Sequence, residues 1–562
     1  MTQPLTIKGW ENGVADSPHM GMGMLRNVDI EAFPGAVKVQ KLPVSYFNTV
    51  TFTATFTAAV TDILTIAGGS VLQYGQPVMF TTTGTLPAGL ALNTVYYMYN
   101  PDNVNFKVAS TMALLNAGTY VNITDTGSGT HTVTTITPST INYIIEDKRI
   151  DTYFFQDNNG RVWYSLGGST TLYLLRGNTL GGDGYSGNGM AILQNSDSTA
   201  VYLFAFRSGN IDVINIYGTS NIETPVWSNS WKTLNSGSGS GNQHYAMMAQ
   251  DGIIYFCDDR YVGSIKENVG SVFDPASAGT YTFNNQALDL PLNESAEWLE
   301  ELGINLMIAG GSWDKIYPWD RISDSFGLPL TVPEKGVKRL KNIGNIVYIL
   351  AGTKGNIYST QGTYVRHFKK LPDYLVNNSS SVQSNVVTWG GIAQRDGALI
   401  FGVGALTTGN SGVYLLYPDG RLIQDNMPST GSRLVTAIFA EDDFYKIGYA
   451  SGADYMGTTR YVSYETVLHS ALYKVGNKTQ KATYSTLEVQ VAKPAASGHM
   501  RIKYRTDEST AFADFPGGAV VCTADSASTS FEFDIGLIDL ENLQIQVEMD
   551  GLFELIELRL LQ

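Results

Sequence analysis

The tripeptide Asp125-Thr126-Gly127 has the residue types of an aspartic-protease active site. That chemistry needs two carboxylates that share one proton, so it requires a second copy of the tripeptide or a symmetric dimer. The chain holds no second Asp-Thr-Gly. Because the surrounding run, residues 124–131, is rich in Thr, Gly and Ser, we interpret the tripeptide as a structural turn.

Two further loops share residue types with known sites. Gly184-x-x-Gly187-x-Gly189 could cradle a phosphate, but no Lys-Ser/Thr and no helix follow it, so a flexible loop is the better interpretation. Residues 157–163, Asp-Asn-Asn-Gly-Arg-Val-Trp, loosely resemble the Asp box of sialidase propellers, which is itself a turn device. Sialidase chemistry also needs three converging arginines. No spacing groups three among Arg26, Arg149, Arg161, Arg207, Arg260, Arg321 and Arg339.

Adjacent acids occur at Glu300-Glu301, Asp258-Asp259 and Glu441-Asp442-Asp443. Neighbouring residues of a strand or helix point to different faces, so such pairs rarely act together as acid and base. The run 441–443 could hold Ca²⁺, although a solvated loop is the simpler interpretation.

Soft metals have one candidate site, His19 with Met20, Met22 and Met24, which could bind copper. The alternating glycines favour a close backbone contact there instead. Cys257 and Cys522 are the only cysteines and have no zinc or disulfide spacing. We therefore predict no catalytic residue, no cofactor and no metal, and expect a protein that is not an enzyme.

Composition points to a turn-rich all-β protein. The 562 residues include 58 Gly and 32 Tyr, and only 15% are charged. The formal net charge of −15 argues against wrapping nucleic acid through phosphate contacts, and against docking on an anionic membrane. No apolar run is long enough to span a bilayer, so we expect no stable membrane insertion. The N-terminus lacks a secretory pattern, so we expect the protein to stay in the cytoplasm or leave it inside something larger.

A hairpin pattern recurs from about residue 150 to about residue 460. An apolar run meets a Gly-containing turn and a second run leaves it, as at Asp157–Gly160, Asp251-Gly252, Asp396-Gly397 and Asp419-Gly420. Asp-Gly and Asn-Gly suit primed hairpin turns, in which both central residues need positive φ. Units roughly 40–50 residues apart have the spacing of four-stranded propeller blades. We therefore predict a β-propeller over residues 138–477 with roughly six or seven blades.

Three other regions differ from this pattern. Residues 1–46 are a Gly- and Pro-punctuated N-terminal segment that we expect to join the propeller. Residues 47–137 are Thr-rich, and their alternating strands predict an inserted, outward-projecting β-domain. Residues 478–562 alternate polar and apolar types, which predicts a C-terminal β-sandwich. One helix is expected at residues 296–302, between Ser295 as N-cap and Gly303 as its end.

The N-terminal motifs resemble those of tailed-bacteriophage tail proteins. Arg26-Asn27-Val28-Asp29 followed by Pro34-Gly35-Ala36 is similar to the lead into the β-propeller of nozzle, or hub, proteins of short-tailed phages. The Thr-rich insertion also resembles a small module of phage tail and fibre proteins, through Leu86–Leu90 and Thr124–His131.

This resemblance implies a structural component of the virion tail, assembled in the host cytoplasm and acting in tail assembly and DNA ejection. It implies a homo-oligomer, a hexamer with a six-fold ring around the DNA exit channel. Its partners would be a portal-proximal adaptor protein and tail fibre or spike proteins. Genomic DNA would pass without specific binding, because carboxylates repel phosphates.

Two alternatives remain open. A receptor- or glycan-binding tail protein would present Tyr and Trp side chains on propeller loops or on the insertion. A glycan-degrading propeller would need acids that converge at the central channel, for which the candidates are Asp258, Asp259, Asp320 and Asp324.

Overall fold

The computed structural model describes short strands at residues 5–7, 24–26, 28–29, 37–39 and 44–45, and most of the chain beyond residue 52. The longer described ranges are 53–67, 74–167, 172–176, 187–207, 209–218, 221–222, 225–235, 245–371, 387–404, 411–426, 434–441, 444–450, 452–457, 466–469, 473–475, 481–491, 499–506, 511–523, 529–549 and 554–561.

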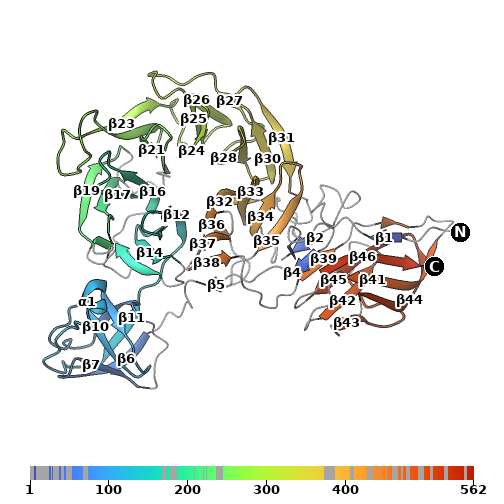
Figure 1. Ribbon diagram of the computed structural model, residues 1–562, viewed down its shortest axis with the longest axis horizontal. Coiled ribbons are helices and arrows are strands. Elements are labelled where there is room, and N and C mark those ends of the chain that lie inside the picture. The colour runs from blue at the N-terminus through green and yellow to red at the C-terminus, as the bar shows by residue number, and fades with distance from the viewer. Residues whose placement is uncertain are drawn as a thin grey trace.

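Among the described residues seven blades of four antiparallel strands form a ring around a common axis (Figure 1), six of them as separate sheets and one as part of a larger sheet. The innermost strand of each sheet contacts that of the next, and β36 returns to β12, so the ring is closed. This confirms the predicted all-β chain with a β-propeller core. The blades are β12 to β15 (Ile141–Asp147, Thr152–Asp157, Val162–Leu166, Tyr173–Arg176), β16 to β19 (Gly187–Gln194, Val201–Arg207, Asn210–Asn215, Trp227–Thr233), β20 to β23 (Ala246–Met248, Ile254–Asp258, Tyr261–Glu267, Tyr281–Asp289), β24 to β27 (Ala296–Leu302, Asn305–Gly310, Lys315–Trp319, Leu330–Thr331), β28 to β31 (Val337–Ile343, Ile346–Ala351, Asn356–Thr360, Val365–Lys370), β32 to β35 (Thr388–Arg395, Ala398–Gly404, Gly412–Leu416, Leu422–Asn426), and β36 to β38 (Val435–Glu441, Phe444–Tyr449, Gly452–Gly457) with β5 (Val44–Ser45).

The seventh blade takes its outermost strand from the N-terminal segment. β5 pairs with β38 at Val44–Tyr455 and Ser45–Asp454. A strand that precedes the first blade in the sequence thus completes the last one. The backbone pairing of β5 with β38 therefore joins residues about four hundred positions apart. Closure of the ring thus rests on backbone hydrogen bonds as well as on side-chain packing.

The repeated Gly turns occupy different positions within the blades. Asp396 and Gly397, between the first and second strands of the sixth blade, have φ of 49° and 75°, as a primed turn requires. In Asp251-Gly252 and Asp419-Gly420 only the glycine has positive φ. Of these three turns, only Asp396-Gly397 is the predicted primed turn. The connections that contain the other two pairs are longer than two residues.

The helix predicted at residues 296–302 is wrong, because this segment is strand β24, the innermost strand of the fourth blade. Its helix-forming residues are overridden by tertiary partners on the neighbouring innermost strand β28. Glu297 Oε1 lies 3.3 Å from Lys338 Nζ, and Glu300 Oε1 lies 3.5 Å from Lys341 Nζ. Gly303 does end the element, but as a positive-φ turn residue between two strands.

Residues 53–135 form a closed six-stranded barrel beside the ring (Figure 1). Its strands are β6 (Thr53–Ala59), β7 (Ile63–Ile66), β8 (Pro77–Thr82), β9 (Tyr96–Tyr99), β10 (Asn105–Ala109) and β11 (His131–Thr135), with helix α1 (Met112–Asn116). Phe56, Phe80 and Phe106 fill its interior. The barrel packs on the outermost strand of the first blade, since the Tyr97 hydroxyl donates to the Leu174 carbonyl oxygen at 2.8 Å.

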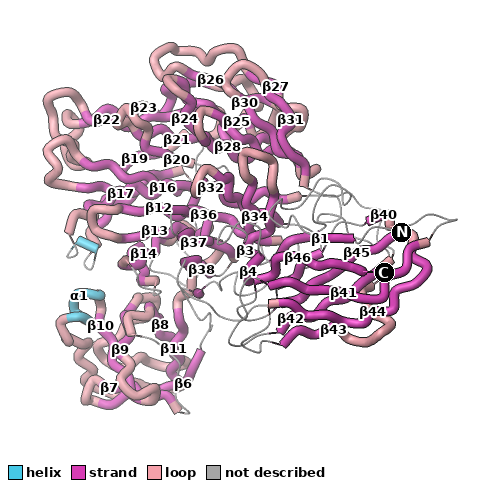
Figure 2. Tube along the Cα trace, turned by 45° about the vertical axis from the view of Figure 1, so that its right-hand side comes forward, coloured by secondary structure: helices cyan, strands magenta, loops and turns pink. Residues whose placement is uncertain are grey.

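The C-terminal strands form two sheets that lie together on one side of the ring (Figure 2). Four N-terminal strands join them, namely β1 (Leu5–Ile7), β2 (Met24–Arg26), β3 (Val28–Asp29) and β4 (Val37–Val39). The C-terminal strands are β39 (Thr466–His469), β40 (Tyr473–Lys474), β41 (Ala482–Val491), β42 (His499–Arg505), β43 (Val520–Thr523), β44 (Ser530–Leu540), β45 (Asn542–Met549) and β46 (Glu554–Leu561).

Two predicted boundaries need correction here. The N-terminal segment joins the propeller as expected through β5 and β2, but β1 and β4 pair with the C-terminal strand β46 instead. The sandwich was expected to begin at residue 478, yet β39 and β40 precede that position and pair with β45. Both errors arise because short strands carry too few alternating residues to reveal their distant partners.

Strand β2 links the propeller to the C-terminal region. It pairs in parallel with β35 of the sixth blade through Arg26 and Gln424, and in antiparallel fashion with β39. The sixth blade and one C-terminal sheet are therefore parts of one ten-stranded sheet.

Candidate functional site in the propeller axis

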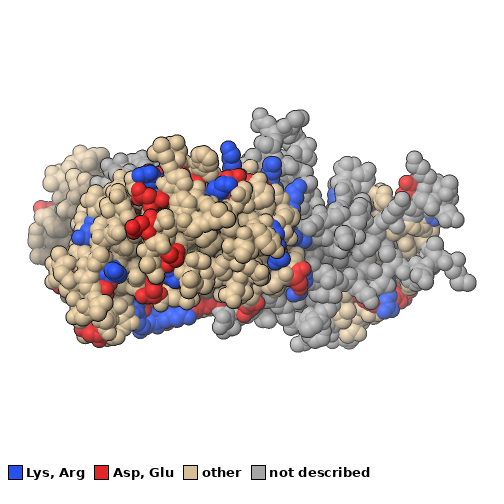
Figure 3. Space-filling view, turned by 90° about the horizontal axis from the view of Figure 1, so that it is seen from above, with Lys and Arg blue, Asp and Glu red and all other residues tan. Residues whose placement is uncertain are grey.

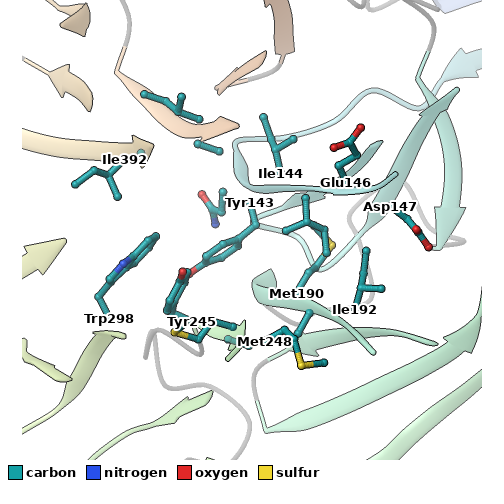
Figure 4. Close-up of a pocket in the computed structure, with 18 of the residues that line it drawn as sticks. Tyr143, Ile144, Glu146, Asp147, Met190, Ile192, Tyr245, Met248, Trp298 and Ile392 are labelled. Atoms are coloured by element: carbon teal, nitrogen blue, oxygen red, sulfur yellow. The ribbon is translucent and has the colours of Figure 1, made fainter. Parts of the chain in front are cut away.

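The propeller axis contains a cavity of about 610 Å³. Side chains of the innermost strands line it, and Figure 4 shows Tyr143, Met190, Trp298 and Ile392 converging on it from different blades. Innermost strands meet around the axis of any such ring, so the fold itself brings these distant residues together.

Three aromatic side chains that line this cavity follow one another, and an arginine outside its lining contacts the last of them. The rings of Tyr245 and Trp298 are stacked, with centroids 3.6 Å apart and planes 15° apart. Tyr143 lies 6.2 Å from Tyr245, and Arg339 Cζ lies 4.6 Å from the Trp298 ring. We call Tyr143, Tyr245, Trp298 and Arg339 the axial stack. Such contacts each add roughly 0.5–2 kcal/mol beyond the burial of apolar area.

Arg339 is held by backbone groups as well as by the indole ring. Its Nε donates to the Gly390 carbonyl at 3.0 Å and its Nη1 to the Lys338 carbonyl at 2.7 Å. Gly390 must lack a side chain, since a Cβ there would lie 1.9 Å from the Val435 carbonyl oxygen. Close approach of β32 to β36 thus fixes the carbonyl that orients the arginine.

The axial stack is uncharged apart from Arg339. Burial raises the pKa of the Tyr143 and Tyr245 hydroxyls, so both stay protonated at neutral pH. Trp298 is 8% exposed. Ring contacts therefore run across the cavity from Tyr143 of the first blade through Tyr245 to Trp298 of the fourth blade.

Charges around the cavity are balanced. Glu146, Asp147, Lys148 and Arg149 line one end, and Arg149 Nε donates to Asp147 Oδ1 at 2.7 Å. On the outer edge of the ring, which Figure 3 shows, acidic side chains likewise lie among basic ones. The acidic excess of the chain is thus not gathered in this cavity.

A second cavity of about 610 Å³ lies where the seventh blade meets the first. Glu441 of β36 and Lys148 of the β12–β13 turn line it, with Lys148 Nζ 2.6 Å from Glu441 Oε1. Glu146 accepts a hydrogen bond from Tyr153 and lies against Glu441. Burial raises the pKa of Glu146, whereas the hydrogen bond from Lys148 lowers the pKa of Glu441.

Lys446 of β37 is buried at this junction, with Nζ 3.4 Å from the centre of the Tyr153 ring. Burial lowers its pKa to about 8, against the attraction of Glu146, Asp151 and Glu441. A lysine whose pKa is lowered by folding binds fewer protons when folded, so stability rises with pH from about 8 towards the unfolded value.

We expect the stability of the wild type, relative to Lys446→Met, to rise by about 2 kcal/mol between pH 7 and pH 10. Only the wild type loses the buried ammonium charge in this range. The measurement is thermal unfolding of both proteins across the range. Lys148→Met, which removes an ammonium on a side chain that is 77% exposed, is the control and should run parallel to the wild type. Parallel curves for the wild type and Lys446→Met would contradict this account.

The structure places the sequence candidates in turns rather than in a shared site. Asp125 Oδ1 accepts the Ala88 N–H at 2.8 Å and the Gly127 N–H at 2.9 Å, which is the predicted structural turn. Asp157 is fully buried and accepts the N–H groups of Asn159 and Arg161, each at 3.0 Å. It also accepts from Trp163 Nε1 at 3.2 Å. The Asp box resemblance therefore corresponds to a turn.

We expect Asp157→Ala to lower the stability of the propeller by about 2–3 kcal/mol, because buried donors lose their acceptor. Asp419→Ala is the matched control, since Asp419 occupies a similar turn with its side chain 54% exposed and should cost less than about 1 kcal/mol. Denaturant unfolding of both variants provides the measurement, and equal costs would refute the role given to burial.

The four acids proposed for glycan hydrolysis do not converge. Asp258 and Asp259 form the turn between the second and third strands of the third blade. Asp320 and Asp324 follow the third strand of the fourth blade, and antiparallel strands place these two connections on opposite faces of the ring. Hydrogen bonds from Ser323 lower the pKa of Asp320, consistent with a turn.

The arginines considered for a sialidase triad lie apart. Arg149, Arg321 and Arg339 have their own partners, which are Asp147, Glu301 and the axial stack. Arg161 Nη1 donates to Thr137, and Arg260 lies 3.4 Å from Asp289. Arg207 does meet a second arginine, Arg176, at the buried carboxylate of Asp212. The Arg26 side chain lies outside the described residues.

The remaining candidates fall partly outside the described residues, including His19 to Gly23, Gly184 and Asp442-Asp443. Glu300 and Glu301 point to different partners, Lys341 and Arg321. Within the described ranges no three His, Cys, Asp or Glu side chains are grouped to hold a metal ion. Both cysteines are buried as free thiols. No helix among the described residues is long and apolar enough to cross a membrane.

Sequence reasoning missed the axial stack and Lys446. Tyr143, Tyr245 and Trp298 stand in three different repeats, and no spacing pairs them. A repeat alignment that registered the first strand of each blade would have brought these positions together.

Comparisons with known proteins add the fold alone. No protein-family model matches the chain, and no curated protein matches it either. Similar solved structures include the β-propeller domain of Cps50 (Swd1) from Myceliophteria thermophila, at 10% identity over 58% of this chain and 98% of that one, with a TM-score of 0.40. The structure of U3-55K is 12% identical over 57% of this chain and 95% of that one, with a TM-score of 0.42. The computationally designed protein Ika8 is 14% identical over 57% and 98%, with a TM-score of 0.36. The assignment of a seven-bladed β-propeller therefore rests on the strand pairing described above.

Proposed function

We propose that this chain is a structural protein of a bacteriophage tail, which builds a nozzle-like hub ring and acts in tail assembly and DNA ejection. The observation that supports it best is the way the N-terminal strands tie the chain together. β5 completes the seventh blade, β2 joins the sixth blade to a C-terminal sheet, and β1 and β4 pair with β46. Propeller and C-terminal strands thus share sheets, which suits a subunit that must transmit load.

The axial stack also bears on where a conduit would lie. From the ring contacts of Tyr143, Tyr245 and Trp298 we infer that DNA passes between copies rather than through one propeller. A closed ring of copies supplies such a passage, and cyclic symmetry is the usual way to build one.

The test is the number of copies in the purified particle, measured by sedimentation velocity and native mass spectrometry. The proposal predicts a discrete closed ring of six copies. A chain that stays monomeric at every concentration, both alone and with the neighbouring tail proteins, would overturn it.

The alternative, a receptor- or glycan-binding tail protein, finds its support in the barrel. Tyr74, Tyr99 and Tyr120 form a chain of neighbouring rings there, with centroids 6.3 Å and 5.3 Å apart, and Tyr74 is 43% exposed. Exposed tyrosines suit contact with sugars or proteins. Deleting residues 53–135 distinguishes the two functions, because the alternative predicts lost host binding with intact assembly.

A further inference from the structure

A lysine lies among three aromatic rings at the outer edges of the second and third blades. Lys232 Nζ lies 5.1 Å from the Trp231 ring, 4.9 Å from the Tyr281 ring and 5.5 Å from the Phe283 ring. Trp231 and Lys232 belong to β19, whereas Tyr281 and Phe283 belong to β23. All three distances fall within the range in which an ammonium group is attracted to a ring face.

A β-bulge presents Trp231 and Lys232 to the neighbouring blade. The register between β18 and β19 shifts between Ile211 and Val213, and Ser230 has a φ of 49°. Asp212 fixes this bulge, since its Oδ1 accepts the Ser230 N–H at 2.6 Å. Three residues of β19, at positions 229–231, lie opposite Asp212 alone, and the two extra residues turn the strand so that consecutive side chains can both face β23.

The ring walls are held by contacts that do not involve Lys232. Trp231 Nε1 donates to the Pro275 carbonyl at 2.8 Å, and the Trp231 and Tyr281 centroids lie 4.9 Å apart. The Trp231 ring also lies near the buried rings of Phe204 and Phe273, with centroid distances of 5.7 Å and 6.2 Å. The three walls therefore remain in place if the lysine is shortened.

The partners of Lys232 are ring faces. Among the described residues its ammonium has no ion pair within 4 Å, although the side chain is half-buried. Attraction to three rings offsets the hydration free energy that the ammonium group loses on burial. Three aromatic walls around one cation are the arrangement that recognises lysine-like and quaternary ammonium groups.

We propose that Trp231, Tyr281 and Phe283 form an ammonium-binding cage that the chain fills with its own Lys232, which thereby joins the second and third blades. The cage accepts a small quaternary ammonium ion when the lysine is shortened.

Thermal unfolding with added tetramethylammonium chloride tests this site in the full chain. We expect Lys232→Ala to unfold about 2–4 °C below the wild type, as the loss of one such brace predicts for a large domain. Tetramethylammonium should raise the unfolding temperature of Lys232→Ala saturably, at millimolar concentrations, and quench or shift its tryptophan fluorescence. Sodium chloride at equal concentration should do neither, and the wild type should respond to neither salt.

Two substitutions of similar length separate charge from packing. Lys232→Arg keeps a cation for the cage and should retain the wild-type unfolding temperature, whereas Lys232→Gln should behave like Lys232→Ala. Lys266→Ala, on the neighbouring strand β22, is the matched control and should change nothing. Equal stability of the Arg and Gln variants, or an equal response of wild type and Lys232→Ala to tetramethylammonium, would overturn the proposal.

Discussion

Replacing Asp212 by Ala will lower the stability of the propeller by about 3–5 kcal/mol, because it leaves two buried guanidinium groups without their shared carboxylate. Asp212 is fully buried in β18. Arg176 Nη2 lies 2.8 Å from Asp212 Oδ2, and Arg207 Nη2 donates to Asp212 Oδ1 at 2.9 Å. The side chains of the two arginines are only 9% and 4% exposed, so water cannot replace the lost partner.

Asp212→Ala should destabilise two places in the ring. Arg176 belongs to the first blade and Asp212 to the second, so the ion pair crosses a blade boundary. Asp212 also accepts the Ser230 N–H that fixes the bulge in β19. Hydrogen exchange should therefore speed up in both β15 and β19.

Asp289→Ala is the matched control for Asp212→Ala. Asp289 also pairs with an arginine, Arg260, but that pair is 3.4 Å long and its side chains are 54% and 31% exposed. An exposed pair of this kind contributes roughly 0–1 kcal/mol. Similar unfolding free energies for the two variants would contradict the claim that burial makes Asp212 essential.

Replacing Trp298 by Ala will cost about 3–5 kcal/mol, the usual penalty for emptying a buried aromatic site. The indole of Trp298 is stacked on Tyr245 and also contacts the Arg339 guanidinium. The alanine variant loses both contacts at once. Denaturant unfolding measures the loss. Trp313→Ala, at a tryptophan that is 50% exposed, should cost less than about 1 kcal/mol.

Trp298→Phe tests how much of this stability comes from ring stacking. Phenylalanine can still stack on Tyr245, so most of the stability should return. If Trp298→Ala were as stable as Trp313→Ala, the contacts of the axial stack would not stabilise the propeller.

The propeller could be predicted from the sequence because its turns are local. Asp157–Gly160, Asp251-Gly252 and Asp396-Gly397 all join consecutive strands, and a hairpin needs only its own residues to be recognised. Blade closure could not be predicted, since Val44 pairs with Tyr455 through β5, a strand of only two residues. Pairing at such separation leaves no periodic trace in either segment.

Residue types alone predict the wrong structure where contacts with distant residues determine it. Residues 296–302 have the composition of a helix, but Lys338 and Lys341 stabilise the glutamates on a strand. The axial stack and the Lys232 cage have the same origin, because each brings together side chains from different blades.

The most direct test of the central claim is a symmetry-resolved electron cryomicroscopy image of the native particle that contains this chain. The account predicts six copies around a channel wide enough for a DNA duplex, with every propeller axis blocked by Tyr245 and Trp298. A single copy at a fibre tip, or DNA threading one propeller, would contradict it.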